Sequence, residues 1–244
     1  MKRIFITGSA DGLGLLAAKE LVKQGHQVVL HARSESRAKE ALAKVPGAET
    51  VLSADLSDME ATKRLADKVN QLGSFDAIIH NAGVYQMPAQ TILSVNTLAP
   101  YILTCLVEPP RRLIYLSSGD HLNGDPTLAG LHAEPPKARY SDSKLHDLIL
   151  AKAVARKWPD VFSNALDPGW VPTKMGGAGA PDDLQKGYET QVWLAVSDDP
   201  KAMVSGKYFR HQRESKYQLK SDDVAIQNEF LHLCEQISGV AFNI

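Results

Sequence analysis

The N-terminal residues read Lys2-Arg3-Ile4-Phe5-Ile6-Thr7-Gly8-Ser9-Ala10-Asp11-Gly12-Leu13-Gly14, a short apolar run followed by a glycine-rich loop. A helix pattern continues to Gly25, and residues 27–31 form a second apolar run. This order predicts a strand, a loop, a helix and a second strand, the beginning of a βαβ unit. The N–H groups that open such a helix attract phosphate, and glycine lets the phosphate approach closely. Three glycines can also make a plain tight turn, but in this context the loop favours phosphate binding.

The loop after the second strand lacks the acid that usually binds a ribose 2′-hydroxyl. The sequence there reads His31-Ala32-Arg33-Ser34. An arginine at this place can accommodate a 2′-phosphate, and the Ser9 hydroxyl could assist it. Arg33 could instead be a solvated loop charge. We therefore expect NADP(H) as the preferred cofactor, with NAD(H) possible.

Strand and helix patterns alternate along the rest of the chain. This alternation predicts one α/β domain over residues 1–244, a three-layer doubly wound parallel sheet (Rossmann fold) of about seven strands in the order 3-2-1-4-5-6-7. Ser57 is the expected N-cap of the third helix. The further helices are expected over residues 36–44, 58–72, 91–106, 140–158, 181–196 and 222–237, and the further strands over 49–53, 75–80, 111–116, 161–166 and 207–210.

Polar and glycine-containing residues follow the expected strands at their carboxyl ends. Asp55 follows the third strand, Asn81 the fourth, Ser118 the fifth and Pro168 the sixth. Ligands of doubly wound sheets bind at this edge. Asn96 lies within an otherwise apolar helix, where a lone asparagine is usually exposed or satisfies a neighbour's backbone.

Tyr140 and Lys144 lie four residues apart at the start of an apolar-periodic helix. Residues at this spacing share one helix face. A free tyrosine has a pKa of about 10, and a nearby ammonium favours its phenolate form. The pair can therefore act as an acid/base device, although a surface pair at this spacing also arises by chance.

Composition excludes several other classes of protein. The chain has 244 residues, 44% of them hydrophobic, and a net charge of −1, which gives no indication of a nucleic-acid or membrane partner. Its two cysteines, Cys105 and Cys234, lie in apolar helix patterns and favour a reducing, cytoplasmic setting. The eight histidines show no ligand spacing, so no metal site is expected. We expect no targeting segment and no apolar run near the ~18 residues of a membrane span.

Taken together, these stretches resemble the short-chain dehydrogenase/reductase family in its single-domain form. The resemblance implies hydride transfer between a nicotinamide and a carbonyl or alcohol carbon. It implies a catalytic tetrad in which Ser118 binds the substrate oxygen, Tyr140 donates the proton, Lys144 lowers the Tyr140 pKa and holds the ribose, and Asn96 positions a water. It also implies a cofactor-binding set of Thr7, Gly8, Ser9, Gly12, Leu13, Gly14, Arg33, Asp55, Leu56, Asn81, Ala82, Gly83, Tyr140, Lys144, Pro168, Gly169, Val171 and Thr173.

Ser118 lies further before Tyr140 than is usual in that family. The extra residues form a loop, 119–137, expected over the site, and Ser117-Ser118-x-x-His121 resembles the branch that contains retinol dehydrogenases. Retinoid specificity does not follow from this likeness. Ser117 stays open as an alternative to Ser118.

The substrate is the least determined part of the function. Segments 84–88, 119–137 and 174–188 should form its walls. Their apolar residues favour a small apolar or aromatic substrate.

The family resemblance implies a homodimer or homotetramer paired through the helices over 91–106 and 140–158. An NADP(H)-sensing regulator without turnover is the alternative function, but such proteins typically lose the catalytic tyrosine or lysine, and this sequence keeps both Tyr140 and Lys144. The chain is too short for the extra substrate domain of a sugar-nucleotide epimerase. The hint of an apolar substrate rests on Leu122, Leu128, Leu131, Trp170 and Met175.

Overall fold

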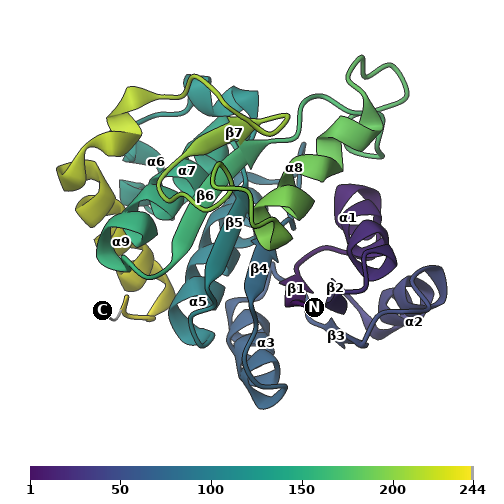
Figure 1. Cartoon of the computed structure of the whole chain (residues 1–244). Helices are drawn as coiled ribbons and strands as arrows, with labels where there is room; N and C mark the ends of the chain where they lie inside the picture. The colour runs from purple at the N-terminus through teal and green to yellow at the C-terminus, as the bar shows by residue number, and fades with distance from the viewer. Residues whose placement is uncertain (243–244) are drawn as a thin grey trace.

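The computed structural model describes residues 1–242, which form a three-layer α/β fold around one sheet (Figure 1). The sheet has eight strands in the order β3-β2-β1-β4-β5-β6-β7-β8, so the predicted fold class is confirmed. Strands β1 to β7 are parallel, and β8 pairs antiparallel with β7. The strands are β1 Arg3–Ile6, β2 Gln27–Ala32, β3 Thr50–Ser53, β4 Ala77–His80, β5 Arg112–Leu116, β6 Phe162–Asp167, β7 Tyr208–Arg210 and β8 Arg213–Glu214.

Strand β8 is the one strand that the sequence did not predict. It has two residues and follows a turn in which His211 and Gln212 both have positive φ angles of 50° and 60°. Such turns usually contain glycine or asparagine, which the sequence would show. With neither residue present, the sequence carried no signal for the hairpin.

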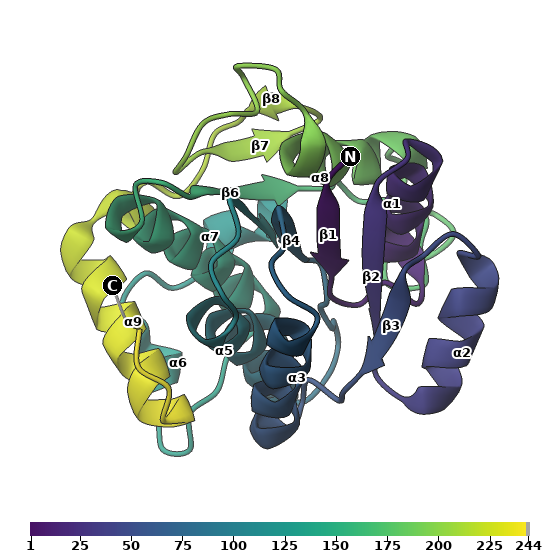
Figure 2. The same ribbon diagram turned by 60° about the horizontal axis from the view of Figure 1, so that its bottom comes forward.

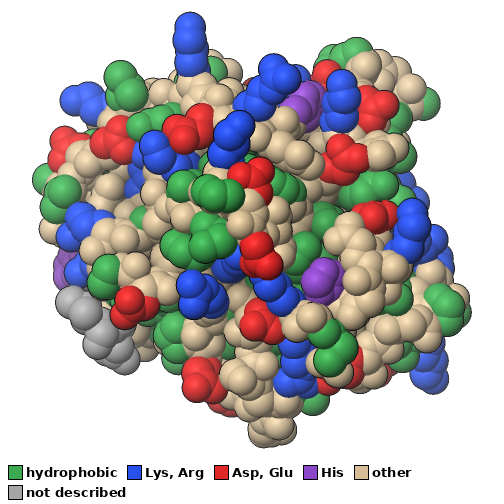
Figure 3. Space-filling view, in the orientation of Figure 1, with side chains coloured by type: hydrophobic (Ala, Val, Ile, Leu, Met, Phe, Trp, Pro, Cys, Tyr) green, Lys and Arg blue, Asp and Glu red, His purple; other side chains and the backbone are tan. Residues whose placement is uncertain are grey.

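Helices cover both faces of the sheet (Figure 2). One face carries α1 Gly12–Lys23, α2 Glu35–Lys44 and α8 Leu184–Val196, and the other carries α3 Met59–Gln71, α5 Ala99–Leu106 and α7 Tyr140–Lys157. Side chains alternate along β1, so Phe5 joins the core beneath α3, α5 and α7, and its neighbours join the core beneath α1 and α8. On the face seen in Figure 3, cations and anions are interspersed, as the net charge of −1 leads one to expect.

The helix predicted over 91–106 is divided into three parts. It begins earlier, with α4 Ala89–Ile92, continues as the π-helical segment η1 Leu93–Leu98, and ends as α5. A π-helical segment of this kind is rare and frequently marks a functional site. Within the described residues, Ala89–Leu106 is also the one stretch apolar and long enough to span a membrane, contrary to the expectation that none approached that length. Because 67% of it is buried inside the protein, it has the character of a core helix.

Asp58, and not Ser57, caps α3. The Asp58 carboxylate accepts hydrogen bonds from the N–H groups of Glu60 and Ala61 at 2.9 and 3.2 Å. The Ser57 hydroxyl instead donates to Asp55 at 2.7 Å. The expected cap was therefore wrong by one residue, because two adjacent polar residues compete for the same position.

The long segment before α7 is folded against that helix. It contains the 3-10 helix η2 Gly119–Asn123 and the short helix α6 Ala129–His132. The Asp142 carboxylate of α7 accepts from the N–H groups of Asp125 and Arg139 at 3.0 and 3.1 Å, so it binds the middle of the segment and the residue that precedes α7.

The last helix covers α7. After the 3-10 helix η3 Leu219–Asp222, α9 Val224–Ser238 packs on the outer side of α7, and residues 142–154 of α7 are all buried within one chain. Pairing through the helix over 140–158, as the family resemblance implied, would therefore require α9 to move away. That part of the expected interface is contradicted, while the oligomeric state itself stays a prediction.

We expect Phe230→Ala to lower the free energy of unfolding by ~3–5 kcal/mol, because it leaves a cavity in a closely packed core. Phe230 is 0% exposed, and its ring lies 5.3 Å from that of His146 on α7. Chemical denaturation provides the measurement. The matched control is Val224→Ala, a residue 47% exposed on the same helix, which should change stability by less than ~0.5 kcal/mol. A small effect at Phe230 would contradict the docking of α9 on α7.

Candidate active site

A cavity of about 520 Å³ lies at the carboxyl ends of the parallel strands. Its volume is typical of small-molecule sites. Within residues 1–242, no three His, Cys, Asp or Glu side chains come together as a metal site. Of the residues that the sequence singled out, the cavity is lined by Gly8, Gly12, Leu13, Arg33, Asp55, Leu56, Asn81, Ala82, Gly83, Tyr140, Lys144, Pro168 and Thr173.

The glycine-rich loop is shaped by close backbone contacts with the end of β4. Gly8 has a φ angle of 64°, and a Cβ atom there would lie 2.8 Å from the Ala82 Cα. The Asn81 amide donates to the carbonyl oxygens of Thr7 and Gly8 at 3.0 and 3.1 Å. A Cβ on Gly14 would lie 2.7 Å from the Gly8 oxygen. Thr7 and Gly14 therefore hold the loop in shape, while Gly8 and Gly12 face the cavity.

Ser9 does not face the cavity, so its expected contribution to phosphate binding is contradicted. It is 0% exposed, and its hydroxyl donates to the Ile6 carbonyl at 2.9 Å and accepts from the His31 N–H at 2.8 Å. Both hydrogen bonds belong to the packing of β1 against β2. A sequence pattern offers no means to distinguish this inward orientation from an outward one.

His31 joins the two loops at the adenine end of the expected cofactor site. Its Nδ1 accepts from the Gly8 N–H at 3.0 Å, and its Nε2 lies 3.0 Å from the Ala54 carbonyl. Burial lowers the pKa of His31 to about 4, so the ring is neutral and Nε2 carries the proton that it donates. Sequence reasoning missed this role, because the histidine was considered only as the place of an absent acid.

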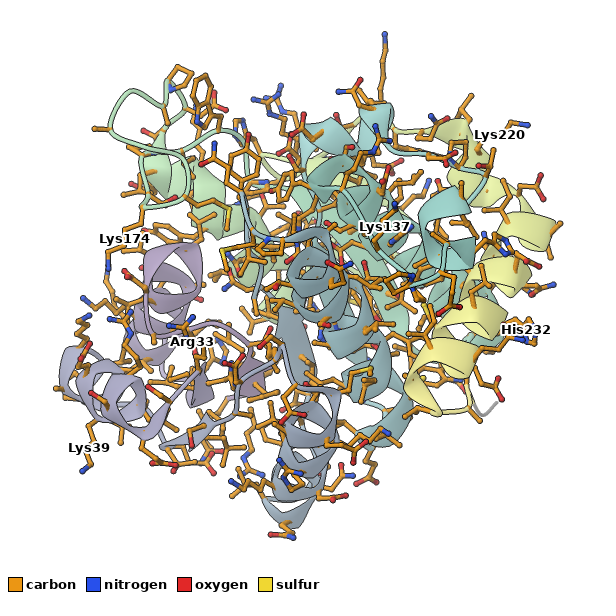
Figure 4. All side chains as sticks on the ribbon, turned by 180° about the vertical axis from the view of Figure 1, so that it is seen from behind. Arg33, Lys39, Lys137, Lys174, Lys220 and His232 are labelled. Carbon is orange, nitrogen blue, oxygen red and sulfur yellow. The ribbon has the colours of Figure 1, made fainter. Side chains whose placement is uncertain are left out.

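Arg33 is exposed at the rim of the cavity. Its charge helps to hold the pKa of Asp55 below the ordinary value, together with hydrogen bonds from Ser57 and against the effect of burial. Figure 4 shows Arg33 and Lys174 on the same side of the molecule, with Lys137 well apart from both. The two cations border the cavity from the second strand and from the 174–188 loop.

Lys174 connects that loop to the glycine-rich loop. Its ammonium forms an ion pair with Asp11, which Arg37 also approaches at 3.3 Å. The hydrogen bond from Lys174 is the largest cause that lowers the pKa of Asp11. Asp11 also caps α1 through the Gly12 N–H at 2.9 Å, so one carboxylate links the helix start to the rim of the cavity.

Pro168 and Thr173 line the cavity, but Gly169 and Val171 between them do not. Gly169 turns the chain with a φ angle of 83°, and its N–H donates to Asp167 at 2.8 Å. Val171 is 4% exposed and packs inward. These two residues therefore shape the segment, whereas Pro168 and Thr173 face the cavity.

Tyr140 and Lys144 lie together at the inner end of the cavity. The Lys144 Nζ is 5.6 Å from the centre of the Tyr140 ring, and it donates to the Leu116 carbonyl at 2.7 Å and to Asp147 at 2.9 Å. Burial raises the pKa of Tyr140, and this outweighs the lowering by Lys144 and Ser118. Lys144 thus lowers the Tyr140 pKa as expected, but the net shift of that pKa is upward.

The two candidate serines have different surroundings. The Ser117 hydroxyl is buried and donates to the Lys144 carbonyl at 2.7 Å, although the residue borders the cavity. Ser118 is half-buried, accepts from the Asp120 N–H at 3.2 Å, and lowers the pKa of Tyr140 through hydrogen bonding. The hydrogen bond that lowers the Tyr140 pKa comes from Ser118, whereas Ser117 and not Ser118 lines the cavity, so the choice of the catalytic serine stays a prediction.

Asn96 is 1% exposed, and its side chain binds neighbouring chain segments. Its Oδ1 accepts from the Val84 N–H at 2.8 Å, and its amide nitrogen donates to the Val84 carbonyl and to the Ser143 hydroxyl, both at 3.0 Å. Asn96 of the π-helical segment thus connects Val84 to Ser143 of α7. The water-positioning role of Asn96 stays a prediction.

The remaining wall of the cavity is apolar. The rings of Tyr85 and Tyr140 meet edge to face, with centres 4.9 Å apart. No residue of the fully described 119–137 loop lines the cavity, and Leu128 and Leu131, which had suggested an apolar substrate, are buried in the core at 2% and 3% exposure. Besides the apolar residues already named, the cavity is lined by Ala54, Val84, Met87, Val95, Leu116 and Met175.

Comparison with known sequences shows the family of the chain. The model of the family described as "short chain dehydrogenase" matches residues 2–183. An uncharacterized oxidoreductase, AN7799, from Emericella nidulans is 44% identical, and the short-chain dehydrogenase chyC from Penicillium rubens is 41% identical; each alignment covers 98% of both chains. Mouse retinol dehydrogenase 14 is 26% identical over 98% of this chain and 86% of its own length.

Solved structures show the same fold. A crystal structure of a protein from Mycobacterium paratuberculosis superposes with a TM-score of 0.84 at 24% identity, covering 100% of this chain and 96% of the other. A blue fluorescent protein from a metagenomic library, solved in complex with NADPH, has a TM-score of 0.70 at 21% identity, covering 85% of this chain and 95% of the other. At these identities the likeness concerns the fold alone.

Gly14→Ala should weaken nucleotide binding by at least tenfold and lower the melting temperature, because its Cβ would collide with the Gly8 carbonyl. Calorimetric titration with NADPH and a thermal melt measure the two effects. Gly179→Ala is the control: nothing lies within 4 Å of a Cβ at Gly179, so binding and melting should stay unchanged. Undiminished binding by Gly14→Ala would contradict the role of the loop.

Proposed function

The chain belongs to the short-chain dehydrogenase family and is an oxidoreductase; from this premise we propose that it transfers a hydride between NADP(H) and the carbonyl or alcohol carbon of a small apolar or aromatic substrate. The observation that carries this proposal is that one cavity brings together the glycine-rich loop, Arg33 and the Tyr140–Lys144 pair. The NADPH complex of the metagenomic neighbour supports the choice of dinucleotide. A cytoplasmic location remains part of the same proposal.

The residues at the cavity fit a dinucleotide. Gly8 and Gly12 line the cavity at the N-terminus of α1, where N–H groups and the helix dipole favour a pyrophosphate, and no atom lies within 4 Å of a Cβ built on Gly12. Asp55 and Leu56 would hold the adenine, and Arg33 the 2′-phosphate. The segment 81–83, with Pro168 and Thr173, would border the nicotinamide, whose chemistry when bound is to give or take a hydride at carbon.

The chain's own residues move the proton. In the reductive direction, the Ser118 hydroxyl binds the carbonyl oxygen, and the Tyr140 O–H bond breaks as its proton passes to that oxygen. The oxygen would gain this proton, and a bound dinucleotide would supply the hydride to the carbon, so that an alcohol forms. The Lys144 ammonium stabilises the phenolate that remains on Tyr140, and two of its three N–H donors already bind Leu116 and Asp147.

The apolar wall favours substrates with little polar surface. A polar group placed against Val84, Met87 and Met175 would lose its hydrogen bonds to water without replacement. The exposed edge of Tyr85 beside Tyr140 suits an aromatic or flat apolar group. We therefore expect aromatic and medium-chain ketones to be reduced more efficiently than charged or sugar-like carbonyls.

Tyr140→Phe should lower turnover by ~10²–10⁴-fold, because it removes the proton donor. It should leave NADPH affinity unchanged, which titration measures beside a carbonyl-reduction assay. Tyr217→Phe, which removes a phenol that binds Asp222 away from the cavity, is the control and should retain full turnover. Retained turnover in Tyr140→Phe would overturn the assignment. Tight NADPH binding by the wild-type protein without turnover of any carbonyl or alcohol would favour the NADP(H)-sensing regulator.

Arg33→Ala should weaken NADPH binding about tenfold, or ~1.4 kcal/mol, and leave NADH binding within about twofold. The reason is that Arg33 would meet only the 2′-phosphate, which NADH lacks. Calorimetric titration of both cofactors measures the difference. Lys39→Ala, an exposed cation that points away from Arg33 in Figure 4, is the matched control for net charge. An equal effect on NADH would show that Arg33 does not select the cofactor.

A further inference from the structure

A buried carboxylate lies one helical turn beyond the catalytic lysine. Asp147 follows Lys144 on α7, and the two residues are 4% and 5% exposed. The Lys144 Nζ donates to the Asp147 Oδ2 at 2.9 Å and to the Leu116 carbonyl at 2.7 Å. Tyr140, Lys144 and Asp147 therefore follow one another along a single face of α7, and the ammonium lies between the phenol and the carboxylate.

The groups on the sheet side of Asp147 are uncharged. Tyr115 of β5 binds Thr104 of α5 through its hydroxyl at 2.8 Å, and the charge of Asp147 contributes to raising its pKa. His80 of β4 stacks on Tyr115 at 4.8 Å, and burial lowers its pKa to about 3, so it stays neutral. Burial likewise raises the pKa of Cys105 on α5 to about 12. None of these neutral groups can serve as the counter-charge of Lys144 in place of Asp147.

The groups on the cavity side act on Tyr140. Ser118 lowers the Tyr140 pKa through its hydroxyl, and the carboxylates of Asp147 and Asp120 raise it. Asp120 lies in η2 and is exposed, so solvent weakens its effect. Among the described residues, Lys144 is the one charged group that acts on the Asp147 carboxylate.

The charge of Asp147 changes the proton affinity of both neighbours. Burial alone would lower the pKa of Lys144, but the charge of Asp147 raises it above the ordinary value. Burial raises the pKa of Asp147 itself to about 6 against the attraction of Lys144, so the carboxylate is ionised at neutral pH. Without this charge, a dry ammonium would lose its proton more readily, and the phenol beside it would ionise more readily.

We propose that Asp147 is a positioning residue that keeps Tyr140 and Lys144 protonated together up to a higher pH, and thereby extends carbonyl reduction to a higher pH. This inference rests on the proposed function, because only the doubly protonated pair can donate a proton to a carbonyl oxygen. The carboxylate also holds the Lys144 ammonium at the end of β5, directly beneath Tyr140.

The test measures proton loss from the pair without any substrate. Protein carrying ¹³C at lysine Cε and tyrosine Cζ reports both ionisations by NMR, and Lys144→Met and Tyr140→Phe assign the two signals. In Asp147→Asn, the first proton should leave the pair at least one pH unit lower than in the wild type, a tenfold change in proton affinity. The alkaline limb of kcat/KM for carbonyl reduction should move by the same amount. A role in packing alone would lower activity equally at every pH.

Two further variants complete the design. Asp147→Glu keeps the charge and should restore the wild-type midpoint. Asp142→Asn removes another buried carboxylate of α7, paired with Arg139, and should leave the midpoint within about 0.3 pH units. Should the amide introduced by Asp147→Asn prevent folding, Asp147→Ser leaves room for water at the ammonium and carries the same expected shift.

The outcomes separate this inference from the proposed function. An unchanged midpoint in a folded Asp147→Asn protein overturns the inference, whatever the enzyme's activity. A shifted midpoint in a protein that reduces no carbonyl supports the electrostatic role of Asp147 and overturns the proposed reaction.

Discussion

The ammonium of Lys144 lies almost wholly out of water, and much of the site depends on how that charge is satisfied. A buried cation is stable only when it is paired and hydrogen-bonded. The Leu116 carbonyl at the end of β5 and the Asp147 carboxylate on α7 provide this, and the Ser117 hydroxyl binds the Lys144 carbonyl from the same strand. The charge therefore fixes α7 against the sheet at the point where Tyr140 enters the cavity.

Tyr140 consequently titrates under opposing influences. Burial and Asp147 raise its pKa, while Lys144 and Ser118 lower it, and the net direction is upward. A phenol with a raised pKa keeps its proton over a wide pH range and is better suited to giving a proton than to taking one at neutral pH. The proton affinity of Tyr140 thus follows from its whole environment and not from the lysine alone.

The sequence predicted the features that depend on local pattern. Alternating apolar runs gave the sheet order, and the residues after each strand gave most of the cavity, because parallel strands end at one edge. It could not predict which way a side chain turns within a loop, and so Ser9 was placed in the cofactor site although it faces the core. It also did not predict the η1 segment, which was expected to be part of one continuous helix over 91–106.

Contacts between segments far apart in the chain could not be predicted from the sequence either. The sequence pattern did not single out Asp147, and the partner of the closing helix α9, which is α7, became known only from the packing. Both corrections concern burial, which the sequence pattern indicates only on average. The substrate loops show the same limit: Leu128 and Leu131 are apolar because they fill the core beneath the loop.

The two ends of the cavity differ in how strongly a charge can act. Arg33 is exposed, so salt screens its attraction for a phosphate, and its contribution to cofactor choice should be small in energy. Lys144 and Asp147 are shielded from water, so each charge changes the proton affinity of its neighbour strongly and with little dependence on salt. Cofactor preference is therefore the property that substitution at the rim can alter most readily. The protonation state of Tyr140 is set instead by buried groups of α7 and β5. Because these groups bind one another, a change in one must be matched by a change in the other if the fold is to be kept.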